Sequence, residues 1–456
     1  ERSNDVRDLG RRILVHLQSG KKHKMNYPKK TIVVGDEITA TILAEVPVEL
    51  LVGVVSSSVS SFSHVSILAH ALGIPAVVGA SNLQASRLEG RELVVDGYRG
   101  CFYIAPSQAI RDEYQRLAEE ENELVSELKE LHDLPAETKD GIQVPLYANS
   151  GLLADITPSI NSGASGIGLY RTEFPFMMRD RFPSEEEQRG IYRHILEAFS
   201  PKPVTLRTLD IGGDKSLPYF PITEDNPFLG WRGIRVTLDH PEIFLVQLRA
   251  MMRANSGLNN MQILLPMVSN ISEVDESLKL IARVHRELIA EGESIIMPRI
   301  GVMIEVPSAI YLIEPLASRV DYFSVGTNDL TQYLLAVDRN NARVASLYDS
   351  MHPAVLHGLM DIVSKARRYN KPVSICGEMA GDPAAALLLL GMGVDSLSMS
   401  AASLPRVKCM IRNFTMTHAR AVLDKALSFD NADSIRYYLN QVLEEAGLGG
   451  LTRAGK

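Results

Sequence analysis

The sequence lacks the features that mark several classes of protein. Its three cysteines, Cys101, Cys376 and Cys409, show no metal-type spacing and no disulfide framework. No apolar run approaches the roughly 18 uncharged residues that span a bilayer, and no secretory signal opens the chain. The formal net charge of −8 argues against a basic surface for nucleic acid. We therefore expect a cytoplasmic protein with reduced thiols that binds neither membranes nor nucleic acid.

The chain of 456 residues is long enough for more than one domain. Its early part predicts a small α/β unit, in which short apolar runs surround one amphipathic helix. The strands expected there are 31–34, 50–55, 76–78, 93–95 and 101–104. Residues 110–134 are dense in Glu and Lys around a narrow apolar stripe, and Pro135 ends the run. This pattern predicts a long connecting helix, with a solvated coiled coil as the alternative.

The rest of the chain alternates short apolar runs with amphipathic stretches of helical length. The strands expected there are 144–149, 166–171, 204–210, 262–268, 300–305, 322–326, 373–376 and 397–400. Eight strand-and-helix units in this length predict a (β/α)₈ TIM barrel. An open doubly wound sheet would show the same alternation, but eight repeats favour closure.

One histidine, His64, lies in the first turn of the amphipathic helix expected in the small unit. Ser63 is its expected N-cap, and Ile67, Leu68 and Leu72 share one helical face. The free N–H groups and partial positive charge of a helix start favour a neutral imidazole and a phosphate attached to it. The pattern therefore suits a histidine that carries a phosphoryl group. A capped surface helix with an incidental histidine is the alternative.

Charged residues gather where the barrel strands are expected to end. In a barrel of this kind the chemistry sits at that edge. Arg171, Arg207 and Arg339 fall at or just beyond strand ends, together with Glu305 and Asp329. Two carboxylates suit Mg²⁺, which keeps some waters and accepts substrate phosphate, and arginines bind phosphate and carboxylate. The pattern predicts a small phosphate- and carboxylate-bearing ligand, although buried Arg–Glu pairs also occur as structural features.

Cys376 ends the seventh expected strand. A buried thiol is commonly an inert core residue, but its position at a strand end leaves a catalytic proton transfer open. Gly212 and Gly213 belong either to a phosphate-contacting loop or to an ordinary turn. The sequence contains no Walker-type phosphate loop.

Six motifs in order resemble enzyme I of the bacterial phosphoenolpyruvate-dependent phosphotransferase system. They are SH at 63–64 followed by ALGIPA at 71–76, GIGLYRTEF at 166–174, RTLDIGGDK at 207–215, NPFLGWR at 226–232, GTNDLTQY at 326–333 and CGE at 376–378. The resemblance covers essentially the whole chain. Residues 177–184 and the tail near 447–451 are similar to the nitrogen branch of that system. The loop before His64 lacks the glycines typical of the sugar branch.

The resemblance implies a reaction and a cofactor. His64 would accept a phosphoryl group from phosphoenolpyruvate and pass it to a small histidine phosphocarrier protein. Glu305 and Asp329 would hold Mg²⁺, and Cys376 would protonate the enolate that leaves.

The resemblance also implies the residues that bind phosphoenolpyruvate. Arg171, Arg207 and Arg339 would clamp the substrate, with Arg232 as a helper, and Asn328 would contact it.

The domain organisation implied by the resemblance has four parts. Residues 1–20 would be the last helix of a carrier-docking subdomain, 21–108 an incomplete swivelling phosphohistidine domain, 109–135 the linker helix, and 136–456 the barrel that binds phosphoenolpyruvate and forms a homodimer. The chain resembles an N-terminally truncated family member, and we expect it not to dock its carrier normally.

Three other functions are compatible with parts of the pattern. A pyruvate-phosphate dikinase or phosphoenolpyruvate synthase fragment shares the histidine domain and the barrel, but such enzymes need an ATP-binding domain that we do not find. A Mg²⁺-dependent lyase or aldolase would explain Glu305 and Asp329 and leave His64 without a role. A non-catalytic relay would sense metabolites through the barrel and signal through partners.

Overall fold

The computed structural model describes residues 27–36, 38, 46–47, 50–57, 74–80, 83, 85–97, 99–213, 215, 217–341 and 343–453. The chain divides into two compact units after Glu119. The helix expected around His64, and the helix expected within residues 1–20, lie outside the described residues. Among the described residues no helix is both long enough and apolar enough to cross a membrane.

The first unit contains the five expected strands. Three of them, β1 (Thr31–Gly35), β2 (Leu51–Ser56) and β3 (Ala76–Val77), form a parallel sheet in the order β1-β2-β3. The other two, β4 (Leu93–Asp96) and β5 (Cys101–Ile104), pair as an antiparallel hairpin. The central strand β2 is the most deeply buried, and its Val54 and Val55 have no exposed surface. The apolar runs thus correctly predicted the five strands of this unit.

The long helix expected over 110–134 is present as α4 (Gln108–Glu130). It ends four residues early for a visible reason. Lys408 donates hydrogen bonds to the backbone carbonyl oxygens of Leu131 and His132, at 3.2 and 2.8 Å. Such a side chain satisfies carbonyls at a helix C-terminus, so the helix can stop before Pro135.

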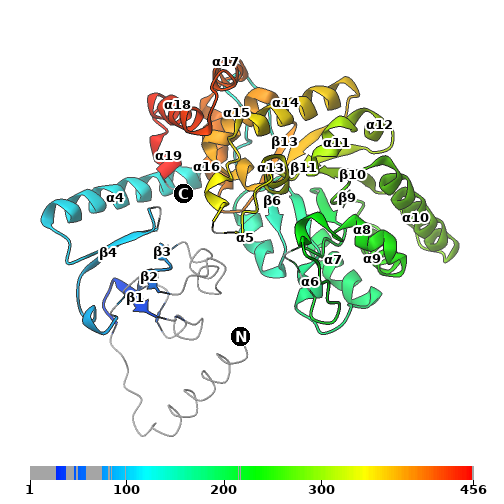
Figure 1. Cartoon of the computed structure of the whole chain (residues 1–456), viewed down its shortest axis with the longest axis horizontal. Coiled ribbons are helices and arrows are strands. Elements are labelled where there is room, and N and C mark those ends of the chain that lie inside the picture. The colour runs from blue at the N-terminus through cyan, green and yellow to red at the C-terminus, as the bar shows by residue number, and fades with distance from the viewer. Residues whose placement is uncertain are drawn as a thin grey trace, which may run out of the picture. The chain divides into compact units, whose positions relative to one another are not determined.

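The second unit contains a closed barrel of eight parallel strands (Figure 1). The strands are β6 (Leu146–Ser150), β7 (Ile167–Arg171), β8 (Val204–Arg207), β9 (Met261–Leu265), β10 (Arg299–Ile304), β11 (Tyr322–Val325), β12 (Val373–Ile375) and β13 (Ser396–Met399). Each strand pairs with the next, and β13 pairs with β6. This closure confirms the predicted barrel and excludes the open sheet.

Helices surround the barrel (Figure 1). They are α5 (Ile156–Asn161), α6 (Phe174–Met177), α7 (Glu185–Phe199), α8 (Ile234–Asp239), α9 (Pro241–Asn255), α10 (Ile271–Ala290), α11 (Pro307–Tyr311), α12 (Ile313–Ala317), α13 (Thr327–Leu335), α14 (Pro353–Arg368), α15 (Pro383–Met392) and α16 (Leu404–Asn413), followed by α17 (Met416–Ala426), α18 (Ala432–Glu445) and α19 (Gly449–Arg453). Every residue of α15 is buried, because α17 packs across it. A helix that is apolar all round requires such a cover.

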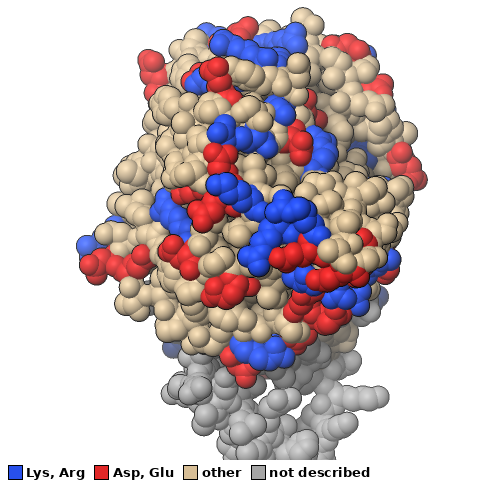
Figure 2. All heavy atoms as spheres, turned by 90° about the vertical axis from the view of Figure 1, so that its right-hand side faces the viewer, with Lys and Arg blue, Asp and Glu red and all other residues tan. Residues whose placement is uncertain are grey.

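Opposite charges are interspersed on the face of the molecule seen in Figure 2. On the barrel surface, Arg249 and Arg253 of α9 both pair with Glu185 of α7, at 2.9 and 2.8 Å, and Arg249 also pairs with Glu291 at 2.8 Å. These pairs join neighbouring helices and leave no single-sign patch over them.

Candidate active site

The barrel places most of the predicted site residues at the C-terminal ends of its strands. Arg171 and Arg207 are the last residues of β7 and β8. Glu305 follows β10 directly, and Cys376 follows β12. Asp329 lies in the first turn of α13, the helix after β11. Parallel strands bring all these ends to one mouth, which is the usual location of barrel active sites.

A chain of ion pairs connects Arg207, Arg232 and Arg339 with two carboxylates, Asp210 and Asp329. Nη2 of Arg232 lies 3.2 Å from Oδ2 of Asp210 and 3.1 Å from Oδ2 of Asp329. Nη2 of Arg339 lies 3.5 Å from Oδ1 of Asp329. Nη2 of Arg207 lies 3.2 Å from Oδ2 of Asp210. These contacts bring Arg207, Arg232, Arg339 and Asp329 into one cluster.

Three further residues belong to the same cluster, and the sequence motifs predicted no role for them: Glu173, Asp210 and Lys215. Oε1 of Glu173 accepts from Nη2 of Arg207 at 2.6 Å, and Nζ of Lys215 lies 3.2 Å from Oε1 of Glu173 and 2.5 Å from Oδ2 of Asp210. Burial acts to raise the pKa of Glu173, but the charges of Arg207 and Lys215 outweigh it and lower that pKa. The available signal was their position, because each lies in a loop directly after β7 or β8.

Arg232 differs from the other arginines because its donors are already occupied. It is 1% exposed, and Nε, Nη1 and Nη2 all lie within hydrogen-bonding distance of Asp210 or Asp329. In this arrangement it bridges two carboxylates. Its predicted contact with substrate remains a prediction.

Glu305 is fully buried and has only one oxygen engaged. Oε1 accepts from the backbone N–H of Met267 at 2.6 Å, whereas Oε2 has no partner among the described residues. Burial, together with the charges of Asp329 and Asp210, raises the pKa of Glu305 to about 7. A buried carboxylate oxygen that has no hydrogen-bond partner and lies near other carboxylates is suited to bind a cation.

Several other buried polar atoms at the same mouth lack partners among the described residues. They are Arg207 Nε, Arg339 Nη1, Gln332 Nε2, the hydroxyl oxygens of Thr208, Thr327 and Thr331, and the carboxylate oxygen Oε2 of Glu173. Buried polar groups are normally hydrogen-bonded, so this group of unpartnered atoms calls for an explanation. Three of these groups are N–H donors and the three hydroxyl groups can also donate, and this surplus of donors favours an anionic ligand.

The donor set at this mouth fits Mg²⁺. Glu305 offers a free oxygen, and Asp329 is close enough for its charge to act on Glu305. Burial acts to raise the pKa of Asp329, but Arg232 and Arg339 outweigh it and lower that pKa, so Asp329 is ionised. The described residues contain no group of three or more His, Cys, Asp or Glu side chains suited to a metal. Two carboxylates suffice for Mg²⁺ when water and substrate phosphate complete its shell.

The Cys376 side chain is suited to act as a proton donor, because its thiol is protonated. It is 3% exposed, and its Sγ lies 3.4 Å from the carbonyl oxygen of Val325. Burial raises the pKa of the Cys376 thiol to about 11, with Glu305 acting in the same direction and Ser324 and Arg207 acting to lower it. The thiol is therefore protonated at neutral pH.

Asn328 faces the same edge of the barrel. Its Oδ1 accepts from the backbone N–H of Glu378 at 3.0 Å, which fixes the side-chain amide between α13 and the loop after β12. The remaining predicted residue, His64, lies outside the described residues. The structure thus brings the barrel residues together and leaves the histidine untested.

Two family models match the chain. One, described as "PEP-utilising enzyme, PEP-binding domain", matches residues 125–416, and the other, "PEP-utilising enzyme, mobile domain", matches residues 27–100. A protein of Salmonella typhimurium called "Phosphoenolpyruvate-dependent phosphotransferase system" is 49% identical over 456 residues, covering 100% of this chain and 61% of the relative. An Escherichia coli protein with the same description is 48% identical over the same shares. A "Phosphoenolpyruvate-protein phosphotransferase" of Haemophilus influenzae is 40% identical over 98% of this chain and 78% of the relative. The chain thus spans 61% of the length of the first two relatives.

Proposed function

The chain belongs to the PEP-utilising enzymes, and on that premise we propose that it transfers the phosphoryl group of phosphoenolpyruvate to His64. A small histidine phosphocarrier protein of the nitrogen-related phosphotransferase system would then receive it. We also propose that the protein is cytoplasmic and forms a homodimer through the barrel. The observation that carries the proposal is the surplus of unpartnered donors beside a bare Glu305 oxygen at the barrel mouth.

The donors would bind the substrate by its two anionic groups. Arg207 and Arg339 each retain a buried N–H without a partner among the described residues, and Arg171 ends the neighbouring strand β7. Guanidinium groups hold phosphate and carboxylate in fixed orientations, and Asn328 would add a contact. This binding would set phosphorus in line with an imidazole nitrogen of His64.

Mg²⁺, held by Glu305 and Asp329, would neutralise charge on the transferring phosphoryl group. Neutral His64 would form a nitrogen–phosphorus bond as the bond between phosphorus and the enol oxygen breaks. The enolate would take a proton at carbon from Sγ of Cys376, which yields pyruvate and a thiolate that solvent reprotonates. The raised pKa of Cys376 keeps that proton available.

Arg232 would act by holding Asp329 in place. Because its guanidinium contacts both Asp210 and Asp329, it fixes a proposed metal ligand relative to the loop after β8. Any direct contact with the substrate would require one of these bonds to open.

The test is labelling with radioactive phosphoenolpyruvate in the presence of Mg²⁺. We expect one acid-labile phosphate per chain, which peptide mapping locates at His64. The variant His64→Ala should lose the label while retaining phosphoenolpyruvate binding measured by calorimetry. Equal labelling of that variant, or labelling by ATP in place of phosphoenolpyruvate, would contradict the proposal, and the second result would favour a dikinase or synthase.

A further inference from the structure

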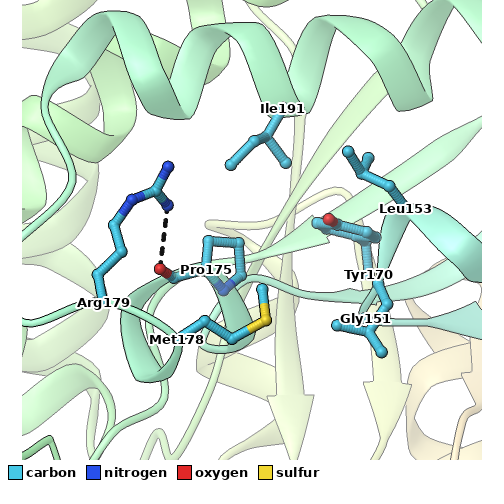
Figure 3. A pocket seen from close by; sticks show the side chains of 8 residues that line it. Gly151, Leu153, Tyr170, Pro175, Met178, Arg179 and Ile191 are labelled. Carbon is cyan, nitrogen blue, oxygen red and sulfur yellow. Dashed lines mark hydrogen bonds between the residues drawn. The ribbon is translucent and has the colours of Figure 1, made fainter. Parts of the chain in front are cut away.

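A cavity of about 430 Å³ opens on the outer side of the barrel, between the loop after β6, strand β7, and helices α6 and α7 (Figure 3). Its walls are mainly apolar and include Leu153, Pro175, Met178 and Ile191. Leu153 and Met178 remain 45% and 69% exposed. Small-molecule sites have volumes of about 300–1,000 Å³ and largely apolar walls. Open apolar surface of this kind commonly marks a binding site.

One buried polar side chain points into the cavity. Tyr170 of β7 is only 1% exposed, and its ring and hydroxyl face the space between Leu153 and Pro175 (Figure 3). Among the described residues the Tyr170 hydroxyl has no hydrogen-bond partner. A hydroxyl on an otherwise buried ring normally has one. The cavity therefore offers an unused hydrogen-bonding group at one wall.

A cation lies at the opposite wall. Nη1 of Arg179 donates to the carbonyl oxygen of Pro175 at 3.1 Å (Figure 3). Its nearest carboxylate, Glu187, is 3.7 Å from Nε and already accepts two closer bonds from Arg181, at 2.8 and 2.9 Å. The charge of Arg179 is therefore only partly compensated. A single guanidinium among apolar walls suits a ligand with one negative charge better than a phosphate dianion.

We propose that this cavity binds a small aliphatic monocarboxylate that carries a second, neutral polar group. The carboxylate pairs with Arg179, the chain lies against Leu153, Met178 and Ile191, and a hydroxyl or carbonyl oxygen hydrogen-bonds to Tyr170. The site lies outside the ring of strands, where the loops after β6 and β7 meet α7. Successive residues of a strand face opposite sides, so Tyr170 faces outward while Leu169 packs in the barrel interior with Cys376.

Binding here would influence the barrel mouth through β7. Tyr170 directly precedes Arg171, so a ligand that fixes Tyr170 also restrains the end of the strand. This consequence rests on the proposed function, because its readout is the affinity for phosphoenolpyruvate. Binding to the cavity itself does not depend on that function, and it is measured separately.

The first experiment uses 6-hydroxyhexanoate as the probe. In protein labelled with ¹³C at the methionine methyl groups, the Met178 signal is assigned with Met178→Leu, and the exposed Met297 serves as the internal control. We expect the probe to shift the Met178 signal with saturation and to leave Met297 unchanged. Hexanoate lacks the hydroxyl group and 6-hydroxyhexanamide lacks the negative charge, and both should bind more weakly.

Variants then assign the contacts. Tyr170→Phe should reduce affinity for 6-hydroxyhexanoate about 3- to 10-fold and leave hexanoate unaffected, because only the hydroxy compound loses a hydrogen bond. Arg179→Gln should reduce affinity for both acids about tenfold or more, whereas Arg189→Gln, an arginine of α7 paired with Glu186, should not. Leu153→Trp should fill the cavity and abolish binding, with circular dichroism confirming its fold.

Three results would overturn the proposal. The first is a Met178 signal that does not shift at probe concentrations up to tens of millimolar. The second is an affinity of the Leu153→Trp and Arg179→Gln variants for 6-hydroxyhexanoate equal to that of the parent protein. The third is a Met178 signal that shifts with protein concentration and not with the probe, which would identify this face as an interface between copies of the chain. These measurements follow binding to the cavity and do not depend on phosphate at His64. Failure of the proposed function would therefore appear as loss of labelling at His64, with binding of the probe unchanged.

Discussion

Gln247 of α9 donates a hydrogen bond of 3.1 Å to the hydroxyl oxygen of Thr172, which lies between Arg171 and Glu173. The Thr172 hydroxyl in turn donates to the carbonyl oxygen of Arg207 at 2.8 Å. Oε1 of Gln247 also accepts from the backbone N–H of Leu209 at 2.9 Å. One fully buried amide on an outer helix therefore joins the loops that follow Arg171 at the end of β7 and Arg207 at the end of β8.

Replacing Gln247 by methionine should weaken phosphoenolpyruvate binding as well as the fold. The variant leaves the N–H of Leu209 buried without a partner, at a cost of about 1–3 kcal/mol. We expect KM for phosphoenolpyruvate to rise several-fold more than kcat falls, because the loops drift apart. Denaturant unfolding and steady-state kinetics measure the two effects. Gln441→Met, on the exposed surface of α18, is the control, and an unchanged KM in the Gln247 variant would limit that residue to stability.

The variant Arg232→Met should strongly destabilise the barrel. It leaves Asp210 and Asp329 as buried carboxylates without this counter-charge, and breaking a buried pair from one side costs about 3–5 kcal/mol. Urea unfolding measures the difference in the free energy of unfolding. Arg283→Met removes an exposed pair with Glu287 and should cost less than about 1 kcal/mol. Equal losses for the two variants would argue against the bridging role of Arg232.

The variant Cys376→Ala should slow the formation of pyruvate more than it weakens phosphoenolpyruvate binding. The enolate would lose its proton donor while the arginines that bind the substrate remain. Single-turnover quench measurements give the rate, and calorimetry gives the affinity. Cys101→Ala, in the hairpin strand β5, provides the matched control. A Cys376→Ala protein that forms pyruvate at the parent rate would return this thiol to the role of a core residue.

The pKa of Glu187 should be about 2 when measured by NMR titration. The side-chain hydrogen bond from Arg181 and the backbone N–H of Ser184 lower it from the ordinary value near 4.5. A lowered carboxyl pKa stabilises the folded state above the unfolded value, and that contribution is lost as the pH falls from about 4.5 to about 2. Arg181→Gln should raise the Glu187 pKa. A Glu187 that titrates near 4.5 in the parent protein would show that the pair does not form in solution.

The sequence alone was sufficient for the repeating architecture. Eight apolar runs with helical spacers predicted the strands, and the strand ends predicted where Arg171, Arg207, Glu305 and Cys376 gather, because backbone pattern and strand alternation are local properties. The end of α4 at Glu130 was not predictable in the same way, since the lysine that takes the following carbonyls, Lys408, lies 277 residues from Leu131 in the chain.

The pairing of charges was decided by the tertiary structure. The motifs contain Arg232, Asp210 and Asp329, but nothing local indicates that one guanidinium bridges both carboxylates, or that Glu305 keeps one oxygen bare. The cavity beside Tyr170 likewise depends on how α6 and α7 pack against β7. Ion pairs and cavities depend on distances of a few ångströms between segments far apart in sequence, and the closure of the barrel sets those distances. Residue types and their period therefore determined the fold, whereas packing determined which polar atoms remain free to bind a ligand.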